Sequence, residues 1–408
     1  MKELVARAFA GAAAAAAVLL AVAPLPAQDQ SGFKMSGNVD AQAVSSLRNQ
    51  SSVFQGISPF SEVTAGGLID GKMVFSRQYT TLGLFDFTFQ ENNVLDHANG
   101  AKIETLSLLV NELYADLNFG DLLYLRLGKQ RLKWGAGFVY NPSDPVNPPK
   151  DPTALRAVRE GVTALKVEVI SKPVSLMTFG VLYDALGQTG VGSRLSTSVI
   201  PNTDVALSGY WSQSESWTAA LNTSVAPLYD VPGWDTLQLW FEGSLYDKAR
   251  YLAAAPGAGS PYYSFLTGGT ATLPDIRTVL LAEYYHLSEG LSAGQLAGAY
   301  QNLRAAPDPT SELLLRPARQ GSDYLYVSVT QPTITDDGNP VFDKIGLSAS
   351  GLVSLTDASF FVTAGIITTF VKDSEVDLTV TWAHGGPDTE FGNAPATVGV
   401  TLDVKVFF

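Results

Sequence analysis

The last twelve residues of the chain alternate without a break between apolar side chains and small or polar ones. Every second position is apolar: Val398, Val400, Leu402, Val404, Val406 and Phe408. Successive side chains of a β-strand point to opposite faces, so this pattern predicts a closing strand with one apolar face. The residues between them include Thr401, Asp403 and Lys405, which give the strand a mixed, polar second face.

The same period of two recurs along most of the chain. Beyond residue 27, no segment reaches the roughly 18 uninterrupted apolar residues of a membrane-spanning helix. The pattern therefore predicts an all-β protein. We expect seventeen strands, separated by turns rich in Gly, Pro, Asn and Ser: 33–47, 66–78, 82–90, 105–118, 122–133, 159–170, 174–184, 194–199, 205–211, 217–225, 236–246, 277–286, 323–330, 342–353, 358–371, 376–384 and 397–408.

The N-terminus has the pattern of a secretory signal peptide. Lys2 and Arg7 precede an apolar run from Ala8 to Val22, and the small residue Ala27 follows two prolines. We expect residues 1–27 to be this leader, although Leu25 is larger than usual for the −3 position and leaves the cleaved bond open. An uncleaved membrane anchor is the alternative, but the run is short for a span. Residues 28–408 contain no dividing linker and are expected to form a single domain.

An exported chain that is 46% hydrophobic and lacks helical spans can satisfy its backbone in lipid as a closed barrel. The closing strand, with its terminal aromatic residue, resembles that of Gram-negative-type outer-membrane β-barrels. In that family a C-terminal Phe is part of the signal read by the barrel-insertion machinery. The resemblance implies location in the bacterial outer membrane, contact with its lipid and lipopolysaccharide, and recognition of the strand that ends at Phe408. A secreted soluble β-protein is the alternative.

The expected architecture is therefore a transmembrane antiparallel up-and-down β-barrel. Bacterial single-chain barrels normally have an even number of strands, so seventeen segments point to an error. We expect about 16 strands, with 18 as the alternative. The error is expected between Lys248 and Ser322, where a strand near Leu313–Leu315 is one possibility. The other possibility is that one of the early segments is not a strand. The alanine-rich segment Ser288–Ala305 is expected to hold a short helix in a loop or plug.

The stretch from Leu125 to Pro152 has the most unusual composition of the chain. Basic residues concentrate in and beside it, although the protein as a whole carries a net charge of −13: Lys129, Arg131, Lys133, Lys150, Arg156 and Arg159. Asn-Pro and Asp-Pro steps then stiffen an irregular backbone. The segment resembles one of porin-like and alginate-export-type outer-membrane barrels, matching at Gly128, Gln130, Trp134, Gly135, Asn141, Pro142, Asp144, Asn147 and Pro148.

This stretch is the candidate constriction of a pore. A stiff loop can enter a barrel lumen and narrow it, and basic side chains there favour anionic solutes. Alternation places Arg126 and Gln130 on the lumen side. Lys129, Arg131 and Lys133 continue the other face, so they either reach the pore through a bulge or lie at the rim. The candidate pore residues, including two from other strands, are Arg126, Gln130, Arg131, Lys133, Asn141, Asp144, Lys166 and Glu242.

Other chemistry finds little support. The acidic net charge argues against a nucleic-acid partner. His97, His286 and His384 are too scattered for a metal-ligand spacing, and the chain has no cysteine. The match Gly290-Leu-Ser292-Ala-Gly294 lacks the α/β context that a nucleophile elbow needs. We therefore expect no enzyme activity, no catalytic residue, no metal site and no cofactor.

The expected function is a channel for passive diffusion of small hydrophilic solutes through a polar lumen, with anionic solutes as the candidates that the basic residues favour. The alternative is a structural or adhesin-type outer-membrane barrel whose lumen is plugged, with Ser288–Ala305 as the candidate plug.

Cell fractionation tests the predicted location. The protein should sediment with outer membranes and migrate faster on gels before heating than after it, because folded barrels resist detergent. Recovery of the protein free in the periplasm or the medium would favour the soluble alternative.

Overall fold

The structure is a computed structural model of the whole chain. It describes residues 33–53, 63–77, 80–96, 101–132, 134–147, 150, 152–153, 160–183, 189–213, 216–231, 233, 236–249, 260–274, 276–308 and 319–408. The expected signal peptide, residues 1–27, lies outside these ranges, as do Lys133, Arg156 and Arg159.

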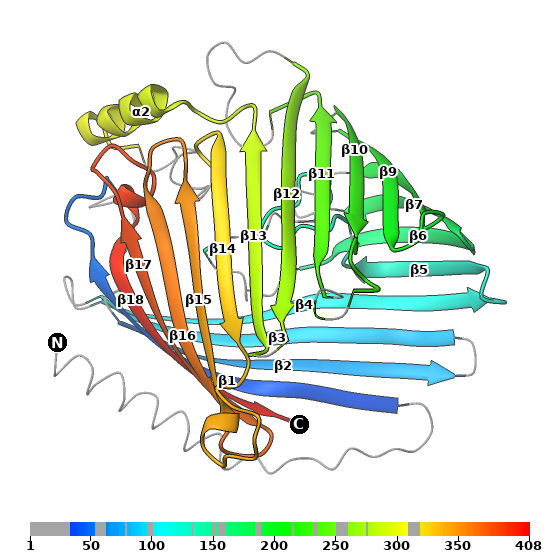
Figure 1. Cartoon of the computed structure of the whole chain (residues 1–408), viewed down its shortest axis with the longest axis horizontal. Helices are drawn as coiled ribbons and strands as arrows, with labels where there is room; N and C mark the ends of the chain where they lie inside the picture. The colour runs from blue at the N-terminus through cyan, green and yellow to red at the C-terminus, as the bar shows by residue number, and fades with distance from the viewer. Residues whose placement is uncertain are drawn as a thin grey trace.

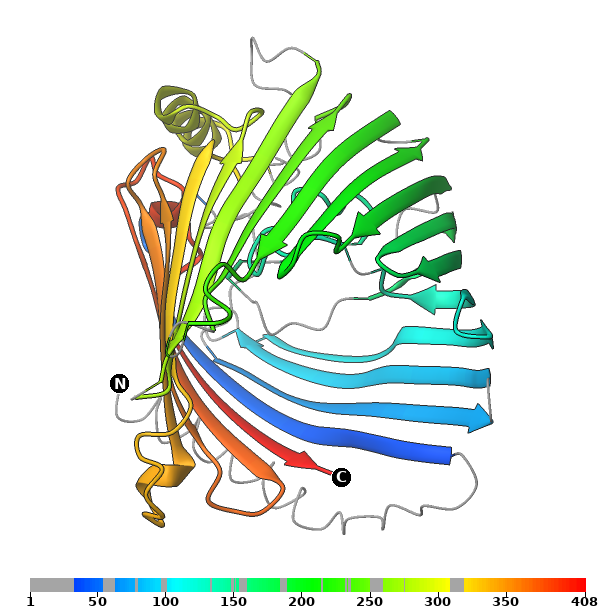
Figure 2. The same cartoon turned by 45° about the vertical axis from the view of Figure 1, so that its right-hand side comes forward.

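The described chain forms one antiparallel sheet of 18 strands, shown in Figures 1 and 2. The first nine are β1 (Phe33–Arg48), β2 (Val63–Arg77), β3 (Thr80–Asp96), β4 (Ala101–Phe119), β5 (Leu123–Gln130), β6 (Val162–Ser171), β7 (Val174–Tyr183), β8 (Gly190–Thr197) and β9 (Thr203–Ser212). The others are β10 (Ser216–Val225), β11 (Gln238–Tyr246), β12 (Tyr262–Leu273), β13 (Thr278–Leu287), β14 (Asp323–Gln331), β15 (Ile345–Ser354), β16 (Phe360–Thr368), β17 (Ser374–His384) and β18 (Ala396–Phe407).

Each strand pairs with its neighbours in the sequence, and β1 pairs with both β2 and β18. The register of the β1–β18 seam places Ala43 opposite Leu402 and Asp40 opposite Lys405. The pairings therefore form a complete ring, which leaves no unpaired sheet edge. The predicted all-β, up-and-down antiparallel barrel is confirmed.

The preferred count of sixteen strands was wrong, and the alternative of eighteen is what the structure shows. The missed strand is β12, Tyr262–Leu273, which lies inside the interval where an error was expected. Its pattern was obscured because Gly268 and Gly269 interrupt the alternation at its centre. The other possibility, Leu313–Leu315, lies outside the described residues.

The alternation of side chains separates an apolar outer surface from a polar inner one. In β9, Ala206, Ser208 and Ser212 are buried on the inner side, whereas Leu207 and Trp211 are exposed on the outer side. In β18, Val400 is exposed outward and Asp403 is buried inward. Apolar side chains exposed all around a barrel are what a lipid-facing surface requires.

The two ends of the barrel differ. At the end of the barrel where β1 begins and β18 ends, most connections between strands are short, such as 120–122 and 172–173. The opposite end has the long connections 131–161, 247–261 and 288–322. Outer-membrane barrels have short periplasmic turns and long extracellular loops, so we assign the second end to the extracellular side.

The chain end completes the seam. The backbone of Phe408 exchanges two hydrogen bonds of 3.0 Å with Gly37 in β1. A Cβ atom at Gly37 would lie 2.7 Å from the Phe408 ring and 2.3 Å from the Asp70 carbonyl oxygen. Glycine is therefore needed where the terminal aromatic ring crosses the first strand.

Among the described residues, no helix has the length and apolar character needed to cross a membrane.

The two faces of β18 give a matched test of the lipid-facing assignment. Val400→Lys places a charge on the outer face and should destabilise the barrel by about 2–4 kcal/mol if the residue lies near the bilayer midplane. Thr401→Lys, on the inner face, should cost much less. Urea unfolding in lipid vesicles measures both, and equal losses would contradict the assignment.

Candidate functional site: a loop fastened inside the barrel

The connection that follows β5 turns into the barrel and packs against its inner wall. Leu132, Trp134 and Val146 join a buried cluster with inward-facing residues of β6, β7 and β9. Further along the connection, Val139 and Tyr140 join a second cluster with residues of β11 to β15. Tyr140 stacks on Tyr285 of β13 with ring centroids 4.2 Å apart. Residues 131–147, here called the lumen loop, are therefore held at two places on the wall.

Glu242, an inward-facing residue of β11, is completely buried and binds the lumen loop. Its carboxylate accepts hydrogen bonds from the Ala136 backbone N–H and, at 2.6 Å, from that of Gly137. It also accepts one of 2.8 Å from the Ser143 hydroxyl group, which in turn accepts one of 2.6 Å from the Asn222 amide. Hydrogen bonds to an ionised group are among the stronger ones in proteins.

Glu283 of β13 binds the next two residues of the loop. Its two carboxylate oxygens accept hydrogen bonds of 2.5 and 2.7 Å from the backbone N–H groups of Phe138 and Val139. The indole N–H of Trp240 donates a third, of 3.0 Å. On the other side of the loop, Lys150 donates to the carbonyl oxygens of Gly137 and Phe138 at 2.6 and 2.7 Å. Four successive N–H groups are thus held by two carboxylates.

Glycines make this approach possible. A Cβ atom at Gly135 would lie 2.5 Å from a Glu242 carboxylate oxygen, and one at Gly137 would lie 2.0 Å from the Tyr140 carbonyl oxygen. Gly135 also has a φ of +72°, a conformation that side chains disfavour. The close approach of the Glu242 carboxylate therefore requires glycine at position 135, directly after Trp134.

The Asn and Asp residues of the same segment fix the far half of the loop. The Asn147 amide donates to the Leu132 carbonyl oxygen at 2.5 Å and accepts from the Leu132 N–H at 3.3 Å. Asp144 accepts from the backbone N–H groups of Val146 and Asn147 at 3.2 and 3.1 Å. With its amide turned to suit its neighbours, Asn141 donates to two carbonyl oxygens, those of Gly137 and Tyr140, each at 2.8 Å.

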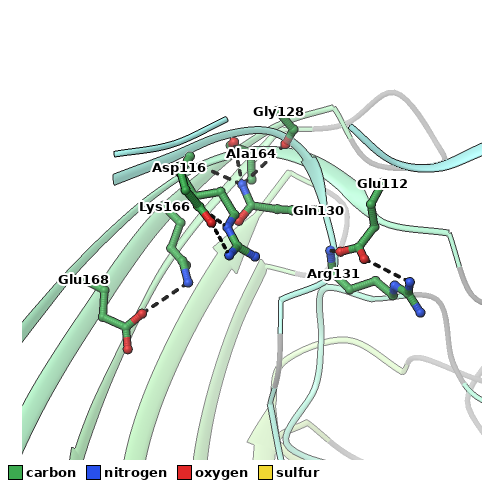
Figure 3. Close-up of polar contacts among 9 residues, drawn as sticks. Glu112, Asp116, Gly128, Gln130, Arg131, Ala164, Lys166 and Glu168 are labelled. Carbon is green, nitrogen blue, oxygen red and sulfur yellow. Dashed lines mark hydrogen bonds and ion pairs between the residues drawn. The ribbon is translucent and has the colours of Figure 1, made fainter. Parts of the chain in front are cut away.

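Charged side chains line the inner wall beside the loop. Arg126 of β5 forms a two-pronged ion pair with Asp116 of β4 at 2.5 and 2.7 Å, and its guanidinium lies 3.8 Å from the centre of the Tyr114 ring. Lys166 of β6 lies opposite Arg126 in the register and contacts Glu168 at 3.2 Å. Figure 3 shows Asp116, Lys166 and Glu168 on one stretch of wall.

Arg194 of β8 is a basic wall residue that the sequence reasoning missed. It lies across Met177 from Glu168 in the register, so it faces the lumen. Its Nη1 atom is buried and has no hydrogen-bond partner among the described residues. The segment 194–199 was expected as a strand, and the inward phase of Arg194 relative to Leu195 was the available signal.

The remaining candidates have other positions. Gln130, the last residue of β5, is fully buried and donates to the Ala164 carbonyl oxygen of β6 at 2.9 Å. Arg131 follows the end of β5 and contacts Glu112 at 2.9 Å, next to an irregularity in the register of β4. Lys129 points outward at the extracellular end of β5 and contacts Glu160 at 2.9 Å, which is a rim position. Lys133 lies outside the described residues.

The expected helix is present as α2 (Ala293–Ala305). Figures 1 and 2 show it above the strand ends at the extracellular end of the barrel. Its buried residues, Leu296, Tyr300 and Leu303, share one face, and Arg304 contacts Asp388 in the β17–β18 connection at 2.8 Å. The helix thus covers part of the rim, whereas the lumen loop lies inside.

Comparison with solved structures agrees with this architecture. Over 94% of this chain and 98% of its own, OccAB1 of Acinetobacter baumannii matches with a TM-score of 0.53 at 10% identity. OccK5 of Pseudomonas aeruginosa matches over 92% of this chain and 98% of its own, with a TM-score of 0.55 at 7% identity. Both belong to the Occ porins. The chain has the fold of a porin-like outer-membrane β-barrel.

A further neighbour of this barrel is Wzi of Escherichia coli, described as an outer-membrane, carbohydrate-binding β-barrel involved in group 1 capsule assembly. It matches over 92% of this chain and 84% of its own, with a TM-score of 0.52 at 12% identity. No family model matches the sequence, and neither does any curated protein. The fold and the apolar outer surface agree with the expected outer-membrane location.

The carboxylate anchors of the lumen loop give a direct test. Glu242→Ala leaves three backbone N–H groups, those of Ala136, Gly137 and Ser143, and the Ser143 hydroxyl group without their acceptor. Each lost bond to a charged group costs about 1.5–3 kcal/mol. Amide hydrogen exchange at Ala136 and Gly137 should therefore become at least about tenfold faster.

Gln238→Ala is the matched control, since Gln238 occupies the exposed start of the same strand. It should leave exchange in the loop unchanged. Equal protection in wild type and Glu242→Ala would show that the carboxylate does not hold the loop.

Proposed function

We propose that this barrel is a channel for passive diffusion of small hydrophilic solutes, with a preference for anionic ones. One observation supports conduction above the others. The lumen loop packs against wall residues of β6, β7, β9 and β11 to β15, whereas six inward-facing polar side chains of β15 to β18 stay partly exposed: Ser348, Ser350, Thr363, Thr379, Thr381 and Thr401. A polar wall that is not covered supports a water-filled passage beside the loop.

The charges on the wall support the anionic preference. Arg126, Lys166 and Arg194 lie on neighbouring inward-facing rows of β5, β6 and β8. Arg126 and Lys166 have carboxylate partners, whereas Arg194 forms no ion pair with the described residues, so no direct contact neutralises its charge. Asp40 and Asp403 lie at the β1–β18 seam, with Lys405 3.6 and 3.2 Å away. A solute would pass between a basic wall and an acidic one.

The alternative function is a surface-interaction barrel with a closed lumen. The likeness to Wzi, a carbohydrate-binding barrel by its description, favours it. The position of α2 above the rim does not support a plug made by that helix.

We also propose that the outer surface contacts outer-membrane lipid and lipopolysaccharide, that the strand ending at Phe408 is recognised by the insertion machinery, and that the protein has no catalytic role.

Planar-bilayer recordings separate the two functions. Purified, heat-modifiable protein should produce stepwise conductance, and Glu242→Ala should increase its size or its fluctuations because the loop narrows the passage. Folded protein that never conducts would contradict the channel function and favour the barrel with a closed lumen.

Reversal potentials in a salt gradient test the role of Arg194. Arg194→Gln should lower the anion-to-cation permeability ratio about twofold or more, because a unit charge about 8 Å from a passing ion contributes ~0.5 kcal/mol even at the dielectric constant of water. Arg277→Gln, in a periplasmic turn, is the control. An unchanged ratio in Arg194→Gln would remove this residue from the selectivity mechanism.

A further inference from the structure

A cleft opens at the extracellular end of the barrel, away from the lumen loop. Its volume is about 430 Å³, which is in the range of small-molecule sites. Three segments that are distant in the sequence form it: the connection after β1, the end of α2 with the residues that follow it, and the connection between β17 and β18. The lining residues are Gln50, Ser51, Ser52, Val53, Leu303, Arg304, Pro307 and Pro387.

The walls of this cleft are fixed by hydrogen bonds between the connections. The Asn49 amide donates to the carbonyl oxygens of Gly392 and Ala394 at 2.8 and 2.9 Å. Ser52 donates its hydroxyl proton to the Asn393 carbonyl oxygen at 2.7 Å, and the Val53 N–H donates to the Asn393 side chain at 3.1 Å. A site whose walls are already held loses little freedom when a ligand binds.

The floor and the rim of the cleft differ in chemistry. Val53 and Leu303 are buried and apolar, and Pro307 and Pro387 extend this apolar surface. Gln50, Ser51 and Arg304 supply an amide, a hydroxyl group and a guanidinium group. Arg304 is held in place by Asp388, whose Oδ1 lies 2.8 Å from its Nη1, and by the Pro387 carbonyl oxygen. The Asp388 carboxylate also accepts a hydrogen bond of 2.9 Å from Gln301.

The charge of Arg304 is therefore balanced before any ligand arrives. The same hydrogen bond from Arg304 holds the pKa of Asp388 below its usual value, so the pair stays ionised at neutral pH. A balanced pair favours a neutral polar ligand over an anion. The Gln50 amide and the Ser51 hydroxyl group, which line the cleft and both donate and accept, suit the hydroxyl groups of a sugar. The apolar floor suits the C–H face of a sugar ring.

We propose that this extracellular cleft binds a neutral saccharide, with Gln50, Ser51 and Arg304 as the polar contacts and Leu303, Pro307 and Pro387 as the apolar ones. This site goes beyond the proposed channel, because none of its residues belongs to the lumen wall or the lumen loop. The shallow, open position indicates weak binding to one or a few sugar units.

Saturation-transfer NMR on the full-length protein in detergent micelles tests the proposal. The probes are maltotriose, galactobiose, mannobiose and chitobiose, with a glucuronate-containing disaccharide as the anionic probe. At least one neutral probe should receive saturation from the protein. Arg304→Ala should reduce that signal at least fivefold, and Asp388→Asn should reduce it too, whereas Arg277→Ala, at the opposite end of the barrel, should not.

Unfolded variants are excluded by heat-modifiable migration and by bilayer conductance, which Arg304→Ala should leave at the wild-type value. A signal that persists in Arg304→Ala would place the sugar in the lumen and overturn the site. Binding of the anionic probe alone, or of no probe, would overturn the proposed ligand class. Absence of conductance in the wild-type protein would instead contradict the proposed channel function. It would not affect the conclusion about sugar binding in the cleft.

Discussion

The arrangement of the lumen depends on how two buried carboxylates and one irregular stretch of backbone satisfy each other. Glu242 and Glu283 point inward from β11 and β13, where little water reaches them. A buried carboxylate without partners is very costly, and so is a buried N–H group without an acceptor. Four successive N–H groups of the lumen loop donate to these two carboxylates. The carboxylates thereby gain donors, the N–H groups gain acceptors, and both costs of burial are avoided.

This mutual requirement explains why several residues of the loop are of an unusual kind. Gly135 and Gly137 leave the space that the Glu242 carboxylate and the turning backbone occupy. Asn147 replaces a missing strand partner for Leu132, and Asp144 closes the turn before it. Trp134 and Tyr140 then fasten the two halves of the loop to different parts of the wall. The loop is a built part of the barrel, and its position determines which wall remains open to solutes.

Much of the fold was predictable because the period of a strand is short and local. The alternation in 236–246 and 397–408 correctly assigned the inner and outer faces of β11 and β18. It failed at β12, where Gly268 lies so close to Trp240 and Glu283 that a Cβ atom would come within 3 Å of both. The close packing that requires glycine there removed the apolar residue that the pattern needed. Local information cannot separate such a strand from a loop.

The features of the candidate site also fall into two groups, those that local sequence patterns determine and those that they do not. The sequence by itself determined the barrel, the inward phase of Arg126, Lys166 and Glu242, and the unusual character of the stretch around Trp134, because each follows from alternation or from residues that constrain the backbone locally. Only the tertiary structure decided that Gln130 is buried against β6, that Glu242 holds the loop, and that α2 lies above the rim. It also showed that one buried donor of Arg194 has no partner among the described residues. Those outcomes depend on which segments, far apart in the sequence, come into contact inside the closed ring. Local sequence patterns do not contain that information.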